Sequence, residues 1–185
     1  MRGRFHHFPA EHPHATLVLG HGAGGSTRIA PDLQALADAL PGAGISVVLH
    51  EQPWRVAGKK VAPAPPTLDA AWIEDLRELP GPVIVGGRSA GARVACRTAA
   101  LTGAIAVVAL AFPLHPPGRP EKSRAEELAV DVPLRIVQGM RDPFGRPEEF
   151  PEGLDIVAVA GDHSLRQGLP QVVDAVRQFV GMVGQ

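Results

Sequence analysis

The 185-residue chain contains a single cysteine, Cys96, which has no partner for an internal disulfide bond. This argues against the disulfide-stabilised domains that are common among small secreted proteins. The first residues, Met1–His7, lack the apolar stretch of a signal peptide. No apolar run approaches the length that would cross a membrane. We therefore expect a cytoplasmic protein that has no membrane partner.

Neither sign of charge is in excess, and aromatic side chains are scarce. The chain has 18 Lys and Arg residues against 19 Asp and Glu residues, so it offers no broad basic surface for nucleic acid. Aromatic residues make up 4% of the sequence, and tyrosine is absent. We expect a core of Ala, Val, Leu and Ile. The length suits one domain, residues 1–185, with one core.

Short apolar runs alternate with amphipathic stretches along the chain, and neither repeats nor linkers interrupt them. Continuously apolar strands that alternate with helices predict a mostly parallel sheet with helices on both faces. Ligands of such sheets bind at the carboxyl ends of the strands, so the residues that follow each strand are the candidates for chemistry. We predict strands at 15–20, 44–49, 82–86, 104–111, 133–138 and 154–160, and helices at 31–40, 67–79, 90–101 and 169–183.

The pattern G-x-S-x-G lies between a predicted strand and a predicted helix, with Ser89 at its centre. A sharp turn from strand to helix strains the backbone of the serine and lifts its hydroxyl above the sheet. Side chains at the flanking positions would collide with the strand or the helix, which explains Gly87 and Gly91. The pattern predicts that Ser89 is a nucleophile. A glycine-rich connector without catalytic meaning is the alternative.

A serine hydroxyl is a poor nucleophile unless a histidine takes its proton and a carboxylate orients that histidine. On a strand–turn–helix site of this kind, the acid and then the histidine follow the serine along the chain. Asp142 follows the predicted strand 133–138, and His163 follows the strand 154–160. We predict that they are the acid and the base. Asp162 is the alternative acid, although neighbouring side chains seldom pair well.

Acyl transfer also needs backbone N–H groups that bind the developing oxyanion. One should come from Ala90, which follows the nucleophile. The second should come from the glycine-rich loop after the first predicted strand, where we assign Ala23, with Gly22 as the alternative. The small residues of this loop let its backbone approach a substrate.

Three further side chains are candidates for substrate contacts. His21 lies in the glycine-rich loop, and Arg88 lies beside the nucleophile. Arg88 could instead form a structural ion pair. His115 lies in a proline-rich segment that could overhang the site, although an exposed loop position is the simpler interpretation. No pattern of metal ligands is present, and we expect neither a metal nor an organic cofactor.

The glycine-rich loop also matches G-x-G-x-x-G, through Gly20, Gly22 and Gly25, which is typical of dinucleotide-binding proteins. Glu51 ends the next predicted strand, where an acid would bind the ribose. Two observations weaken this alternative. The helix is predicted to begin near Pro31 rather than within the glycines, and Glu51 lies further along the chain than the pattern requires.

Taken together, five segments resemble the small predicted hydrolases related to dienelactone hydrolase, above all the testis-expressed-protein and NSL-complex-subunit type and its bacterial relatives. The resemblance implies an α/β-hydrolase fold with a minimal lid and a Ser-His-Asp triad. Dienelactone hydrolase usually carries cysteine where this chain carries Ser89. The segments are Gly20–Gly24, Gly86–Gly91, Phe112–Gly118, Gln138–Gly145 and Gly161–Leu165.

The expected function is hydrolysis of a small ester or thioester through an acyl-enzyme intermediate, with a small-molecule acyl compound as the only partner. Two alternatives stay open. Some relatives of this group act within protein assemblies, which allows a binding module without catalysis, because a fold does not dictate a function. A dinucleotide-binding oxidoreductase is the other. The sequence leaves the oligomeric state undetermined.

Overall fold

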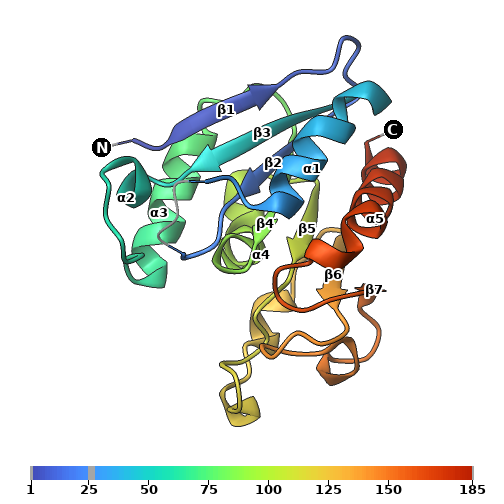
Figure 1. Ribbon diagram of the computed structural model, residues 1–185. Helices are drawn as coiled ribbons and strands as arrows, with labels where there is room; N and C mark the ends of the chain where they lie inside the picture. The colour runs from blue at the N-terminus through green and yellow to red at the C-terminus, as the bar shows by residue number, and fades with distance from the viewer. Residues whose placement is uncertain (1, 25–27, 185) are drawn as a thin grey trace.

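The computed structural model describes residues 2–24 and 28–184. In this part of the chain, a seven-stranded sheet has the order β1-β3-β2-β4-β5-β6-β7 (Figure 1). The first strand runs antiparallel to β3, and every other neighbouring pair is parallel. The strands are β1 (Arg4–Phe8), β2 (Ala15–Gly20), β3 (Ile45–Glu51), β4 (Ile84–Arg88), β5 (Ala106–Leu110), β6 (Leu134–Gly139) and β7 (Asp155–Val159).

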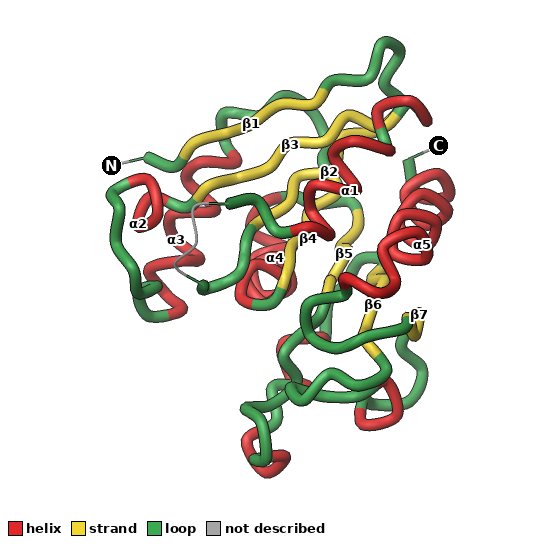
Figure 2. The backbone as a smooth tube through the Cα atoms, in the orientation of Figure 1, coloured by secondary structure: helices red, strands yellow, loops and turns green. Residues whose placement is uncertain are grey.

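Helices cover both faces of the sheet (Figure 2). One face carries α1 (Pro31–Ala39) and α5 (Leu169–Val183), and the other carries α3 (Pro65–Leu76) and α4 (Ala90–Thr102). A four-residue helix, α2 (Pro53–Val56), follows β3. None of the helices in the described ranges is both long enough and apolar enough to cross a membrane.

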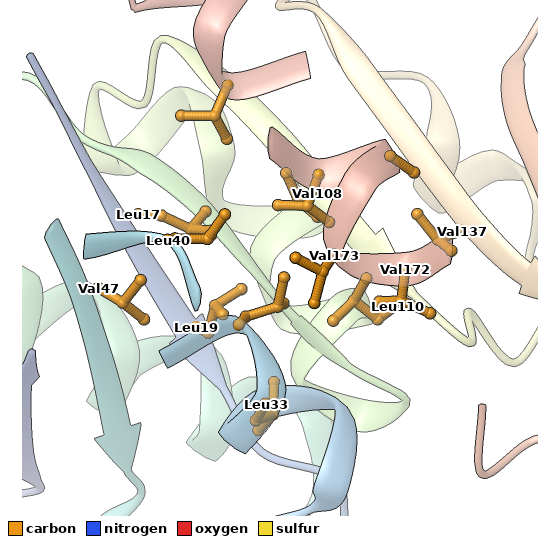
Figure 3. Packing of buried hydrophobic residues seen from close by; sticks show 14 of the residues in the cluster. Leu17, Leu19, Leu33, Leu40, Val47, Val108, Leu110, Val137, Val172 and Val173 are labelled. Carbon is orange, nitrogen blue, oxygen red and sulfur yellow. The ribbon is translucent and has the colours of Figure 1, made fainter. Parts of the chain in front are cut away.

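Aliphatic side chains fill the space between the sheet and its helices. On the face of α1 and α5, Leu19 of β2 and Leu110 of β5 pack with Leu33 and Val172 from the two helices (Figure 3). All four are almost fully buried. Burial of each such side chain contributes about 1.5–3 kcal/mol. The predicted aliphatic core is confirmed, and it fixes the positions of the strand ends.

Local residue chemistry explains where the helices begin and end. Pro31 occupies the first helical position of α1, where the N–H group that proline lacks would have no partner. Gly103 closes α4 in the left-handed conformation, with φ of 65°. The predicted start of α3 at Thr67 is wrong. The helix begins at Pro65, because two successive prolines fit its first turn, and it ends at Leu76.

One strand and one α-helix were not expected from the sequence. The strand β1 pairs with β3 at the edge of the sheet. Its apolar residues, Phe5 and Phe8, face opposite sides and pack against different core clusters. The strand therefore shows no apolar alternation that a sequence pattern could reveal. The helix α2 is a single turn inside a proline- and glycine-rich loop, and its only buried residue is Trp54.

Candidate active site

Ser89, Asp142 and His163 meet at the carboxyl end of the sheet, although 74 residues separate the first from the last. Ser89 follows β4, Asp142 follows β6 and His163 follows β7. The Nε2 atom of His163 lies 3.0 Å from Oγ of Ser89. Its Nδ1 atom lies 2.7 Å from Oδ2 of Asp142. The three side chains thus form a continuous hydrogen-bonded relay in the predicted order.

The backbone of Ser89 is strained. Its φ of 54° and ψ of −113° lie in a region that residues with a β-carbon rarely adopt. The turn holds this conformation because β4 passes directly into α4. A β-carbon on Gly87 would lie 2.6 Å from the carbonyl oxygen of Gly20, and one on Gly91 would overlap the same oxygen. The two glycines therefore permit the close packing that the turn requires.

Hydrogen bonds hold both carboxylate oxygens of Asp142, which is 1% exposed. Oδ1 accepts the backbone N–H of Phe144 at 2.8 Å. Oδ2 accepts the side-chain amide of Gln138 at 2.9 Å. Sequence reasoning missed Gln138, which is fully buried at the end of β6. These bonds hold the carboxylate of Asp142 in the orientation that faces His163.

The second candidate acid, Asp162, turns away from His163. Its Oδ1 atom accepts both the backbone N–H of Ser164 at 2.9 Å and the hydroxyl of Ser164 at 2.6 Å. These two bonds lower the pKa of Asp162. The residue is exposed and forms a local turn. The carboxylate in contact with His163 is therefore that of Asp142.

Two residues contact His163, one at its ring and one at its backbone. The ring of Phe144 packs against the imidazole, with 4.3 Å between the ring centroids. The guanidinium of Arg88 donates a hydrogen bond of 2.6 Å to the backbone carbonyl of His163. Phe144 was not singled out from the sequence. Its position two residues after the acid was the only available signal.

The two expected oxyanion donors line one small pocket of about 10 Å³. Ala90 is the first residue of α4, so the helix itself provides no partner for its N–H group. Ala23 lies in the loop that follows β2. Trp54 and Trp72, both buried, complete this pocket on the side of α2 and α3. The alternative donor, Gly22, lines it as well.

His21 anchors this loop. Its Nδ1 atom donates to the carbonyl of Gly22 at 2.7 Å, and its Nε2 atom accepts the N–H of Gln52 at 3.0 Å. Burial lowers the pKa of His21 from 6.5 to about 4, despite the opposing effect of the bond to Gly22. Because the neutral ring uses both nitrogens within the protein, His21 supports the loop instead of offering a polar atom to substrate.

The remaining candidate contacts also have partners within the protein. Nε of Arg88 lies 3.1 Å from Oδ2 of Asp32, a fully buried carboxylate of α1. The expectation of an exposed His115 is wrong, because only 6% of it is accessible. Its Nε2 atom lies 3.0 Å from Glu149, and its Nδ1 atom lies 2.9 Å from the carbonyl of Pro116. The bond to Pro116, followed by that to Glu149, raises its pKa against the effect of burial.

The dinucleotide pattern lacks its structural context. In the described part of the chain, α1 begins at Pro31, beyond the glycines, so no helix opens at Gly20 or Gly22. The third glycine of the pattern, Gly25, lies outside the described residues. A nucleotide phosphate would need a helix N-terminus at the glycines themselves.

A family model described as "Alpha/beta hydrolase domain" matches residues 13–170. The chain belongs to this alpha/beta hydrolase family. A comparison with curated proteins gave no match. The matched region begins before β2 and ends within the first residues of α5, so it contains the whole relay of side chains.

Solved structures share the alpha/beta hydrolase fold. A serine hydrolase homologue from Coxiella burnetii aligns with a TM-score of 0.78 and 16% identity, over 96% of this chain and 91% of the other. A serine hydrolase without a lid from Xanthomonas campestris has a TM-score of 0.76 and 18% identity, over 97% and 88%. Dienelactone hydrolase from Anabaena variabilis has a TM-score of 0.76 and 17% identity, over 98% and 92%.

Proposed function

We propose that this alpha/beta hydrolase is a serine esterase or thioesterase that acts on a small acyl substrate through a Ser-His-Asp triad. The observation that carries the proposal is the relay from Ser89 through His163 to Asp142, with distances of 3.0 and 2.7 Å, on a strained strand-to-helix turn. A serine held only for structural reasons would need neither the strain nor the relay.

In the proposed reaction, Oγ of Ser89 attacks the carbonyl carbon of the substrate and passes its proton to Nε2 of His163. The carbonyl oxygen becomes an oxyanion, which accepts hydrogen bonds from the N–H groups of Ala23 and Ala90. His163 then gives the proton to the leaving oxygen or sulfur, and the bond between this atom and the acyl carbon breaks. Asp142 stays ionised and stabilises the transient imidazolium.

The second half of the reaction releases the acyl group. A water molecule gives a proton to His163 and attacks the acyl carbon, and a second tetrahedral intermediate forms in the same oxyanion site. Its collapse returns the proton to Oγ of Ser89 and releases a carboxylic acid.

A panel of p-nitrophenyl esters with increasing acyl length tests the proposal, together with labelling by a fluorophosphonate probe. We expect turnover of the shorter esters and labelling of one serine. Ser89→Ala should abolish labelling and lower kcat by about 10⁶-fold, the scale known for nucleophile removal. Ser123→Ala, at an exposed position, should change neither. Turnover that persists in Ser89→Ala would refute the nucleophile.

Absence of both turnover and labelling in a folded wild-type protein would favour the binding-module alternative. The narrower resemblance to the testis-expressed-protein and NSL-complex-subunit type stays a prediction, as does the cytoplasmic location. The location is supported by Cys96, the single cysteine, which is unpaired, so the fold uses no disulfide bond. Cell fractionation of a tagged chain would test it.

A further inference from the structure

A second pocket, of about 470 Å³, adjoins the candidate active site and is strongly basic. Four guanidinium side chains line it, from Arg28, Arg55, Arg88 and Arg166. We call it the arginine pocket. Among the described residues, no carboxylate lines it. Four cations around one cavity create a positive potential that favours an anion.

Arg88 and Ser164, the chain neighbours of the nucleophile and the base, line the arginine pocket, whereas Ser89 and His163 themselves do not. Gly22, which lines it, is close enough that a β-carbon there would lie 3.5 Å from Cβ of Ser89 and 3.4 Å from Nη1 of Arg88. Arg88 is bonded to the carbonyl of His163, and Ser164, the next residue, lines the pocket too. The cavity therefore borders the relay on the side of His163.

Carboxylates outside the lining offset part of the charge of this pocket, since Glu51 acts on Arg55 and Asp32 on Arg88. Asp32 forms an ion pair with Arg88, but it is fully buried in α1. Arg55 donates through Nη2 to the carbonyls of Gly22 and Gly24, whereas its buried Nε has no hydrogen-bond partner in the described structure. Arg166 is exposed. An anion in the pocket would supply the acceptor oxygens that planar guanidinium groups bind well.

The position of the pocket indicates which part of a substrate enters it. His163 must reach the leaving atom to protonate it, so the leaving group lies on the side of His163. The oxyanion donors Ala23 and Ala90 line the other pocket, whose volume of about 10 Å³ is about what one water molecule needs. The arginine pocket, on the side of His163, is therefore the cavity that can take the leaving group.

We infer that the leaving alcohol or thiol of the substrate carries a phosphate or carboxylate, which the arginine pocket binds. The inference rests on the proposed function, because it assigns the leaving-group side from the role of His163. Arg88 and Arg55 also hold the site together, since they bond to His163 and to the oxyanion loop. Arg166 is the member of the pocket whose charge can be removed most cleanly.

Acetyl thioesters that differ only in the charge of the thiol provide the test, with release of the thiol as the measurement. The anionic members are S-acetyl-3-mercaptopropionate and S-acetyl-4′-phosphopantetheine. S-acetyl-N-acetylcysteamine and S-acetylpantetheine are neutral, and acetylthiocholine is cationic. We expect kcat/KM to be at least about tenfold higher for an anionic member than for its neutral counterpart, the size of one charge-assisted hydrogen bond. The anionic member with the larger gain in kcat/KM over its neutral counterpart shows whether the pocket prefers phosphate or carboxylate.

Arg166→Gln should reduce the preference for the anionic over the neutral thioesters about three- to tenfold. High salt should reduce it as well, because exposed charges are screened. Arg177→Gln, which removes an exposed arginine from α5, is the matched control and should have no effect. Equal turnover of the anionic and neutral members, with Ser89 active, would overturn the inference and leave the proposed function intact.

Binding to Ser89→Ala separates the two ideas further, because it needs no turnover. Isothermal titration should show tighter binding of S-acetyl-4′-phosphopantetheine than of S-acetylpantetheine, and Arg166→Gln should narrow the difference. The same comparison between S-acetyl-3-mercaptopropionate and S-acetyl-N-acetylcysteamine covers the carboxylate. Equal affinities in both comparisons would show that the arginine pocket does not bind an anion. This conclusion would hold whether or not the thioesters are turned over.

Discussion

The side-chain amide of Gln138 donates a hydrogen bond of 2.9 Å to Oδ2 of Asp142, the oxygen that also faces Nδ1 of His163. The same amide lies 2.8 Å from the carbonyl oxygen of Gly145 and 3.3 Å from that of Phe112. Gln138 thus ties the carboxylate to the ends of two strands and to the turn that carries it. It acts through Asp142, as a positioning residue.

Replacing Gln138 with leucine should lower kcat about ten- to a hundredfold and leave KM nearly unchanged. A hydrogen bond to an ionised group contributes about 1.5–3 kcal/mol, and here it orients the acid, which matters in the transition state and not for substrate binding. Steady-state kinetics on a p-nitrophenyl ester measures the changes in kcat and in KM separately.

Gln34→Leu on α1, where the amide bonds to the exposed Asp38, is the matched control and should retain full activity. Urea unfolding of both variants identifies conditions in which they are folded. An unchanged kcat in folded Gln138→Leu would contradict the positioning role.

The two acids near His163 should differ sharply on mutation. Asp142→Asn should lower kcat by about 10⁴-fold, because the amide stabilises the wrong tautomer of the imidazole and cannot balance its charge. Asp162→Asn should change kcat less than about threefold, because Asp162 bonds to Ser164 and not to His163. Steady-state kinetics of the two variants and the wild type at pH 7.5 measures both changes in kcat. The reverse ranking of the two variants would transfer the acid role to Asp162.

Strands β2 to β7, the nucleophile turn and the order of the three relay residues could be predicted, because they depend on local patterns. Apolar runs mark β2, β4 and β5, and the pattern G-x-S-x-G marks the turn at Ser89 within five residues, although its glycines pack against the distant Gly20. These features are encoded within short windows of sequence.

The supporting contacts could not be predicted, because they join segments that are distant along the chain. The proline-rich surroundings of His115 indicated an exposed loop. In the structure, the carboxylate of Glu149, 34 residues away, forms a hydrogen bond with the ring of His115. Arg88 reaches the carbonyl of His163 across 75 residues. Which acceptor an arginine or histidine finds is decided by tertiary packing and leaves no periodic signal.

The half-buried His21 should make the free energy of unfolding depend on pH. Its pKa is about 4 in the folded protein, against an ordinary value of 6.5, because burial disfavours the charged ring. Between these values the unfolded chain binds a proton that the folded chain does not, so stability falls as the pH falls. The loss from pH 7.5 to pH 4 should reach about 3 kcal/mol from this residue.

Urea unfolding at several pH values, followed by tryptophan fluorescence, measures that loss in wild type and in His21→Asn. The asparagine amide can still donate to the carbonyl of Gly22 but does not titrate, so its stability should decline less towards acid. His12→Asn, at an exposed position, should follow the wild-type curve. Parallel curves for wild type and His21→Asn would show that His21 is not the titrating group.

Two glycine-to-alanine changes should affect stability with opposite signs. In Gly91→Ala, the new β-carbon would overlap the backbone carbonyl of Gly20, which cannot rotate away as a side chain could. Such overpacking costs about 1–3 kcal/mol, and it displaces the turn that presents Ser89, so labelling by a fluorophosphonate should slow as well.

The α5 residue Gly181 provides the counterpart, because no atom lies within 4 Å of the position that a β-carbon would occupy. Alanine favours a helix over glycine by about 1 kcal/mol, so Gly181→Ala should stabilise the fold and leave labelling of Ser89 unchanged. Urea unfolding and labelling rates measure both variants. Because the two changes add the same single carbon, the opposite signs can come only from the space around it. A stable, fully labelled Gly91→Ala protein would show that the turn does not need the close approach of α4 to β2.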